Sequence, residues 1–148
     1  MRQVPPPLWA LLLLAATYYL SLAPGLDALP LWPTRPYGSI IVLAALALVF
    51  FAMAQFFFAN TQLLPNSETN NALVTNGVFA LTRNPMYLAM VVGCLGGALW
   101  FGRPLMLLAP AAMFAVANWV FIPFEEGKMR RQFGDAFDAY TRRVRRWI

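Results

Sequence analysis

The sequence contains no histidine, a single cysteine and little charge. Without histidine there is no imidazole general base, no histidine zinc ligand and no nucleophile activated by histidine. Because Cys94 is alone, an intrachain disulfide and a metal site built on a cysteine pair are both excluded, and we expect no metal. Any chemistry must therefore depend on carboxylates, arginine, tyrosine, backbone groups and a bound cofactor.

Charged residues make up only 11% of the 148 residues, and hydrophobic residues make up 60%. The chain is too apolar for an ordinary soluble domain of this size, and its length fits a single domain over residues 1–148. The net charge of +5 arises mainly after Glu126, where most of the basic residues lie. Charge concentrated in a tail favours a membrane surface, not a nucleic acid, as the partner.

Four apolar stretches predict an all-α integral membrane bundle with about four transmembrane helices. About 20 residues, each rising about 1.5 Å, cross a hydrocarbon core of about 30 Å. The second and fourth stretches reach this length unaided, and only residues 102–104 separate the last two, which should form a tight hairpin. The predicted spans are residues 8–23, 39–59, 86–101 and 105–124.

The first stretch has a second interpretation. Arg2, the apolar run and the small residues at positions 21–23 resemble a signal peptide with its cleavage site. Tyr18 and Tyr19 instead suit the aromatic belt at the end of a transmembrane helix. We expect the stretch to be retained as a span.

The basic tail also predicts the orientation. Under the positive-inside rule the C-terminus lies in the cytoplasm, and an even number of spans returns the N-terminus to the same side. The loop at residues 60–84 then becomes cytoplasmic, whereas the loop at residues 24–37 faces the other way. We therefore expect a multi-pass protein of the inner or plasma membrane, with both termini and any active site cytoplasmic.

Arg83, Asn84 and Pro85 stand where the third span begins. A proline in the first turn of a helix loses no hydrogen bond, and the open N–H groups there favour a carboxylate or phosphate. Arg83 adds a bidentate donor at the same place. Two interpretations stay open: a site for an anionic ligand, or helix capping combined with a lipid-headgroup contact.

Glu125 and Glu126 directly follow the fourth span. They can complement the dipole of a new helix that begins with them. Alternatively, they can hold the hydroxyl or ammonium groups of a ligand whose carboxylate meets Arg83.

An amphipathic interfacial helix is predicted over residues 125–143. Its apolar side chains recur at helical spacing, and Gly134 is expected to weaken or kink it. The helix should lie at the membrane interface, either as an anchor or as a lid over the cytoplasmic ends of the spans, with its basic end on anionic lipid. The apolar face is Met129, Phe133, Phe137, Tyr140 and Val144, and the basic end is Arg142, Arg143, Arg145, Arg146 and Trp147.

Small and polar residues inside the spans predict contacts between helices. Gly93 and Gly97 lie four residues apart, a spacing that permits two helices to approach closely. Gln55 and Asn118 are isolated polar groups that should face protein and not lipid.

Four segments stand in a fixed order: residues 73–79, residues 83–87, the pair Glu125 and Glu126, and residues 133–140 followed by the basic end. In this order and spacing they resemble the isoprenylcysteine carboxyl methyltransferase family, a group of small integral membrane enzymes similar to the phospholipid N-methyltransferases. The resemblance covers the C-terminal part of the chain. The first two spans add only a compatible hydropathy.

The resemblance implies S-adenosylmethionine as the methyl donor, bound on the cytoplasmic side between the last two spans and the tail. Asn84 stands where the family has a histidine, so it can donate a hydrogen bond but cannot carry charge. Phe121 stands where the eukaryotic prenylcysteine enzymes have an arginine that serves the substrate. The residues implied are Arg83 and Glu126 for catalysis, and Asn84, Pro85, Met86, Tyr87 and Glu125 for cofactor binding.

The resemblance further implies a lipophilic methyl acceptor. A carboxylate acceptor needs no general base, which suits a chain without histidine, whereas an amine or thiol must be deprotonated, by Glu126 or by water. Two alternatives stay open. One is methylation of a phospholipid amine or a small hydrophobic thiol, and the other is a non-enzymatic role in lipid binding or assembly.

Overall fold

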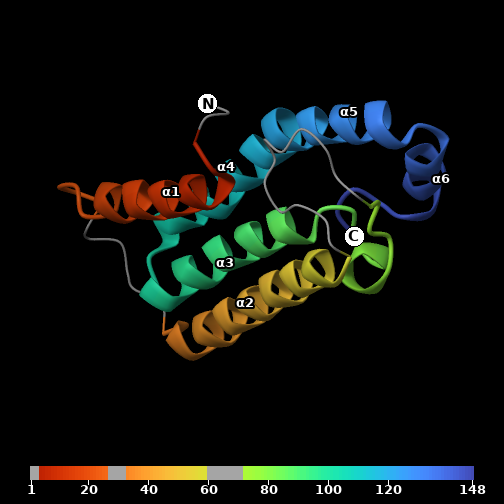
Figure 1. Cartoon of the computed structure of the whole chain (residues 1–148). Helices are drawn as coiled ribbons and strands as arrows, with labels where there is room; N and C mark the ends of the chain where they lie inside the picture. The colour runs from red at the N-terminus through yellow and green to blue at the C-terminus, as the bar shows by residue number, and fades with distance from the viewer. Residues whose placement is uncertain (1–3, 27–32, 60–71) are drawn as a thin grey trace.

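The computed structural model describes residues 4–26, 33–59 and 72–148, and the elements in these ranges are helices, without a strand. Figure 1 shows an elongated bundle from which α5 and α6 extend at one end. The α-helices are α1 (Pro6–Leu20), α2 (Arg35–Phe58), α3 (Pro85–Phe101), α4 (Leu108–Val116), α5 (Ile122–Phe133) and α6 (Asp135–Arg143). Two 3₁₀ turns, η1 (Gly77–Ala80) and η2 (Pro104–Leu107), and a π-helical segment, η3 (Ala117–Phe121), connect them.

The predicted hairpin between the last two spans is present. The helix α3 ends at Gly102, which has a φ of 66°, a left-handed conformation that glycine adopts without strain. The N–H of Gly102 donates to the carbonyl oxygens of Ala98 and Leu99, and Pro104 then begins η2. The chain therefore reverses within three residues.

The helix after this turn corrects the predicted boundaries. It runs from Pro104 to Phe133 without interruption, so Glu125 and Glu126 do not begin a new helix at residue 125. The π-helical segment ends two residues before Pro123, which lacks an N–H and would crowd the carbonyl group four residues earlier in a regular α-helix. The chain breaks instead at Gly134, whose φ of 49° and ψ of −125° suit only glycine, and α6 follows as a separate helix.

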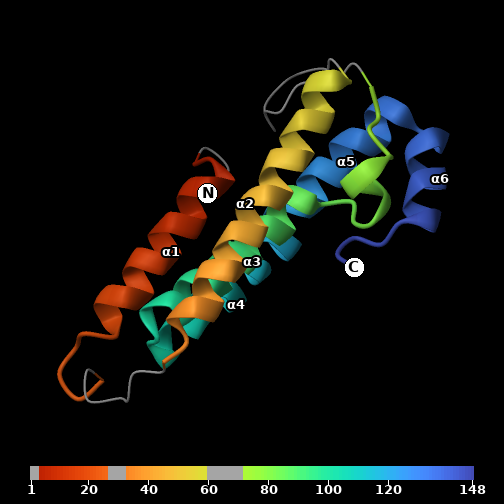
Figure 2. The same ribbon diagram turned by 90° about the horizontal axis from the view of Figure 1, so that it is seen from below.

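The helices α2 and α3 pack along each other over most of their length (Figure 2). At their crossing, a Cβ atom added to Gly96 would lie 2.8 Å from the backbone nitrogen of Val42, and one added to Gly38 would overlap the backbone of Trp100. Close approach through small residues, as predicted, therefore occurs, but mainly through Gly38 and Gly96. Of the predicted pair, Gly93 meets Ala45 of α2 and Gly97 meets Leu14 of α1.

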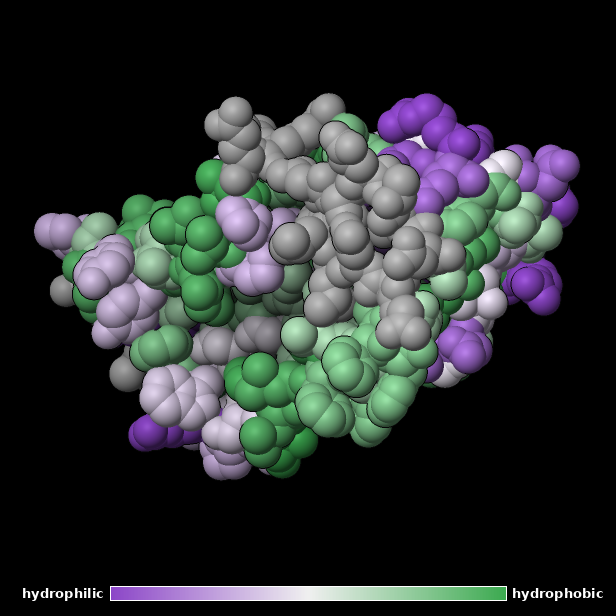
Figure 3. Space-filling model, in the orientation of Figure 1, coloured by the Kyte–Doolittle hydropathy of each residue, from purple (hydrophilic) through white to green (hydrophobic). Residues whose placement is uncertain are grey.

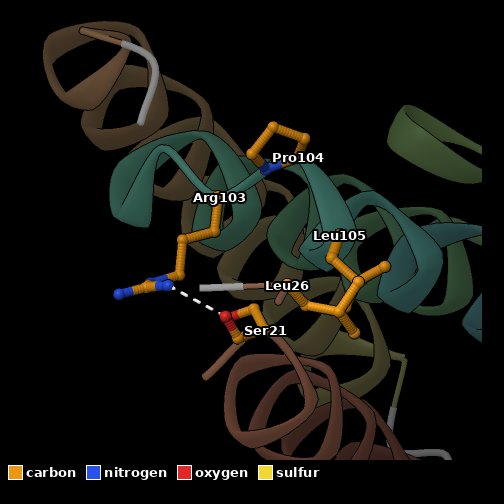
Figure 4. Close-up of a pocket in the computed structure, with 5 residues that line it drawn as sticks. All are labelled: Ser21, Leu26, Arg103, Pro104 and Leu105. Atoms are coloured by element: carbon orange, nitrogen blue, oxygen red, sulfur yellow. Dashed lines mark hydrogen bonds between the residues drawn. The ribbon is translucent and has the colours of Figure 1, made fainter. Parts of the chain in front are cut away.

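The helix α1 packs against α3 and α4, and a core of buried side chains fills the space between the helices. The Cys94 thiol is buried in this core and contacts the carbonyl oxygen of Ala10 at 3.8 Å. At the end of the bundle away from α6, Arg103 donates to the carbonyl oxygen of Ser21 at 3.1 Å and lines a small hollow with Pro104 (Figure 4). This bond ties the end of α1 to the hairpin turn.

The outer surface of the bundle is apolar. Hydrophobic residues cover α2, including Phe57 and Phe58, which are 77% and 81% exposed, whereas hydrophilic residues gather over α5 and α6 (Figure 3). Two described helices, Arg35–Phe58 and Pro104–Phe133, are long and apolar enough to cross a membrane. A surface of this kind, with these two helices, marks a membrane protein.

Two shorter helices, Pro6–Leu20 and Pro85–Phe101, are also apolar. They match the first and third predicted spans to within three residues at each end. The arrangement with four spans, and its orientation in the membrane, stay predictions.

Candidate functional site

The two predicted site segments meet at the hydrophilic end of the bundle. Residues 83–87 lie at the start of α3, which begins at Pro85, and Glu125 and Glu126 lie just beyond Phe124, where the apolar part of the long helix ends. The C-terminal residues return to the same place, beside η1 and the start of α3 (Figures 1 and 2). Segments about forty positions apart in the chain thus become neighbours.

Tyr87 and Glu125 form the first direct link between α3 and α5. The Tyr87 hydroxyl donates to Oε1 of Glu125 at 2.6 Å, a short distance typical of a bond to a carboxylate. The Tyr87 ring is buried and stacks on Phe121, with 6.0 Å between the ring centroids and 19° between the planes. The phenol therefore holds one oxygen of the Glu125 carboxyl group in a defined position.

The second link is an ion-pair triad. Glu126 accepts from Nη2 of Arg83 at 2.8 Å through Oε1, and from Nη2 of Arg146 at 2.6 Å through Oε2. A further bond of 3.2 Å joins Nε of Arg146 to Oε1. Both Glu126 oxygens thus accept from guanidinium groups, and the Arg83 and Glu126 side chains are only 13% and 15% exposed.

The two adjacent carboxyl groups have opposite pKa shifts. Burial raises the pKa of Glu125, and the hydrogen bond from Tyr87 and the charge of Lys128 oppose this only in part. Burial acts in the same direction on Glu126, but hydrogen bonds from Arg146 and Arg83 outweigh it and hold the pKa of Glu126 below its usual range. Of the two carboxyl groups, Glu125 is therefore the stronger base.

Arg83 and Asn84 donate most of their hydrogen bonds to the C-terminal segment. The Arg83 backbone N–H donates to the carbonyl oxygen of Arg145, and its Nη1 donates to those of Thr141 and Val144, each at 3.0 Å. Asn84 Nδ2 donates to the carbonyl oxygen of Arg146, also at 3.0 Å. The Arg83 Nε is different: it is buried and has no hydrogen-bond partner among the described residues.

Two residues of the predicted basic end point into the protein instead of toward lipid. The Trp147 ring packs on Phe114 with 4.7 Å between centroids, and its Nε1 donates to Oδ1 of Asn118 at 3.1 Å. Arg146 belongs to the triad described above, so its assignment to a lipid anchor is corrected. Asn118 faces protein, as predicted.

The predicted apolar face of the tail also contacts protein. Phe137, Tyr140 and Val144 are buried together, with Leu73 packed against them. The Tyr140 hydroxyl donates to the carbonyl oxygen of Phe79 at 2.6 Å, and burial raises the pKa of Tyr140 to about 12. The helix α6 is therefore fastened to the segment before α3, and its position at a membrane interface stays a prediction.

The structure thus brings Arg83, Asn84, Tyr87, Glu125 and Glu126 together, while their functional roles stay predictions. Pro85 is buried where it begins α3, and Met86 is half-buried next to it.

Sequence reasoning missed Arg146 and Trp147 as parts of this region. The signal available was Asn118, a polar residue in an apolar helix that needs a protein partner.

Comparison with known proteins identifies the class. A family model described as phospholipid methyltransferase matches residues 33–136, which include α2, α3 and α5. The chain belongs to this family. Together with the plant relatives described next, this match confirms the resemblance drawn from the four sequence segments.

Several individual proteins are similar to part of the chain. The chain is 32% identical over 81 residues to protein-S-isoprenylcysteine O-methyltransferase B of Arabidopsis thaliana, a match that covers 52% of this chain and 39% of the relative. A probable protein-S-isoprenylcysteine O-methyltransferase of Oryza sativa subsp. indica is 31% identical, with 52% and 40% covered. An uncharacterized protein of Haemophilus influenzae is 35% identical over 63 residues, with 43% of this chain and 100% of the relative covered.

The chain spans about two fifths of the length of the plant relatives that it matches. No solved structure matches it.

Proposed function

We propose that this protein is an integral membrane methyltransferase that uses S-adenosylmethionine and methylates a lipophilic acceptor. The observation that carries this proposal is the direct hydrogen bonding of the two motif segments, Tyr87 to Glu125 and Arg83 to Glu126, at one end of an apolar bundle. Family membership supports methyl transfer. The names of the plant relatives and of the family support a lipophilic acceptor, either a prenylcysteine-type carboxylate or a phospholipid amine.

The residues present fit S-adenosylmethionine. Glu125 offers a buried carboxylate suited to an ammonium or hydroxyl group, and Tyr87 orients it. The buried Arg83 Nε, which lacks an acceptor among the described residues, suits a carboxylate. Asn84, Pro85 and Met86 complete the proposed site at the same turn of α3.

When bound, the cofactor supplies a methyl group on a sulfonium. The role of the protein in the reaction is to orient the two reactants and to exclude water. Apolar helices suit a lipid-like acceptor that enters sideways from the bilayer, and the hydrophilic end suits a polar cofactor that enters from the aqueous side.

The geometry refines the roles of Arg83 and Glu126. Because both oxygens of Glu126 are held by guanidinium groups, this carboxylate is a weak general base, and its contacts suit a positioning role. Arg83 joins that carboxylate to the tail, and its buried Nε has no acceptor among the described residues, so it can donate to a ligand. A carboxylate acceptor needs no base; for an amine or thiol acceptor, Glu125 is the better base, because its pKa is raised.

Glu125→Ala tests the site. We expect this variant to bind S-adenosylhomocysteine at least about tenfold more weakly, because a hydrogen bond to a charged group contributes about 1.5–3 kcal/mol. Isothermal titration calorimetry on the purified protein measures the affinity, and Asp135→Ala, which removes an exposed carboxylate of α6, is the matched control. Unchanged affinity with an intact fold removes Glu125 from the site, and no binding by the unaltered protein favours the non-enzymatic alternative.

The proposed topology places both termini and the site in the cytoplasm, with Arg142, Arg143 and Arg145 on anionic lipid headgroups. All three side chains are exposed. Single cysteines in place of Asp27, which lies outside the described residues, and of Arg142 should react with a membrane-impermeant maleimide from opposite sides. The background is Cys94→Ala, and reaction of both from one side would contradict the arrangement with four spans.

A further inference from the structure

The direction in which Glu125 points depends on the π-helical segment η3. One extra residue in an α-helix turns everything that follows by about 100°, because the helix has about 3.6 residues per turn. Glu125 lies four residues after the end of η3, and its carboxyl group meets Tyr87 on α3. Relaxation of η3 to regular α-helix would rotate Glu125 away from Tyr87.

The C-terminal residues bridge this segment from one side to the other. The Trp147 ring packs on Phe114, which precedes η3, and its Nε1 donates to Asn118 inside η3. Arg146 reaches Asn118 at 3.4 Å through Nη1 and also Glu126, which follows η3. One side-chain oxygen within the irregular turn, Oδ1 of Asn118, therefore accepts from both residues.

We propose that Trp147 is a positioning residue for the cofactor site. Its indole N–H and the Arg146 guanidinium hold Asn118, maintain the π-helical turn, and so direct the Glu125 carboxyl group toward Tyr87 and the cofactor. The proposal rests on the function proposed above, because it assigns Glu125 to the cofactor.

Trp147→Phe isolates the relevant contact, because phenylalanine keeps a ring against Phe114 but has no N–H for Asn118. We expect this variant to bind S-adenosylhomocysteine about five- to tenfold more weakly, the effect of one lost hydrogen bond of about 1–1.4 kcal/mol. Trp119→Phe is the matched control. Trp119 lies on the same π-helical segment and also contacts Phe114, but it is 69% exposed, so its replacement should leave the affinity unchanged.

A double-mutant cycle separates positioning from a general loss of stability. If Trp147 acts through Glu125, Trp147→Phe should cause no further loss of affinity in a Glu125→Gln background. Asn118→Asp, which keeps an acceptor oxygen beside Arg146, should retain binding, whereas Asn118→Leu should lose as much as Trp147→Phe. Equal losses from Trp147→Phe with and without Glu125 would overturn the proposal.

Hydrogen exchange supplies a readout that does not depend on the cofactor. In Trp147→Phe, the amides of residues 117–126 should exchange about tenfold faster, while those of α2 should be unchanged. Unchanged exchange in residues 117–126 would overturn the proposal even if Glu125→Gln binds too weakly to measure. A different outcome is that Glu125→Gln binds as tightly as the unaltered protein while Trp147→Phe still speeds exchange in residues 117–126. In that case Trp147 does stabilise η3, but the assignment of Glu125 to the cofactor fails.

Discussion

Removal of residues 128–148 is expected to abolish binding of S-adenosylhomocysteine while the helices of the bundle remain inserted and folded. The truncation deletes the carbonyl groups that Arg83 and Asn84 contact, the Arg146 partner of Glu126, and the Trp147 contact with Asn118. It also leaves the Arg83 and Glu126 side chains open to water, which weakens every electrostatic contact at the site. Titration calorimetry measures the binding, and far-ultraviolet circular dichroism of the detergent-solubilised protein checks that the helices persist.

The control for this truncation changes charge without removing the tail. Replacing Arg142, Arg143 and Arg145 with glutamine, and keeping Arg146, should loosen attachment to vesicles that contain anionic lipid but preserve cofactor binding. Arg146 must be kept because it pairs with Glu126. If the truncated protein binds S-adenosylhomocysteine as tightly as the full chain, the tail is an anchor and not a lid, and its contacts with Arg83 serve stability alone.

Gly38→Ala is expected to destabilise the protein by about 3 kcal/mol, because the added methyl group would overlap the backbone of Trp100 and force α2 away from α3. Backbone atoms cannot move aside as the end of a flexible side chain can. The free energy of unfolding in mixed detergent micelles, followed by the loss of helical signal, measures the effect.

Gly93→Ala provides the matched comparison. It makes the same chemical change in a helix of the same pair, but its added Cβ would meet the Ala45 Cβ at 3.6 Å, an ordinary contact. Its stability should therefore stay within about 1 kcal/mol of the unaltered protein, or rise slightly as glycine is removed from a helix. Equal destabilisation by the two variants would show that the close crossing at Gly38 does not hold α2 against α3.

The site residues are held by a network that connects three distant parts of the chain. Arg83 comes from the start of α3, Glu126 from α5 and Arg146 from the C-terminus. Removing one member of a buried ion pair leaves an uncompensated charge, so such triads hold their elements in one arrangement. Glu126 directly follows Glu125, so the contacts that fasten the tail lie beside the Tyr87–Glu125 bond.

Composition and hydropathy were sufficient to predict helices, a membrane location and the polar end of the bundle, because lipid demands long apolar helices and their order along the chain is visible locally. The four motif segments likewise predicted that residues 83–87 and Glu125 would meet, which the structure shows.

The sequence pattern within one helix could not reveal which residues of the other helices each of its faces would contact. The spacing of Gly93 and Gly97 indicated a close crossing, yet α2 meets α3 mainly at Gly38 and Gly96, because the choice depends on how both helices are rotated.

In the tail, too, the sequence predicted the helical pattern but not the contacts. Its arginines and tryptophan are typical of a lipid anchor in sequence, and the amphipathic pattern predicted one helix over residues 125–143. In the folded chain Arg146 and Trp147 turn inward to Glu126 and Asn118, residues at least twenty positions away. Such bonds form because buried polar groups must be paired, and the available partners are set by the packing of the whole bundle and not by neighbouring residues.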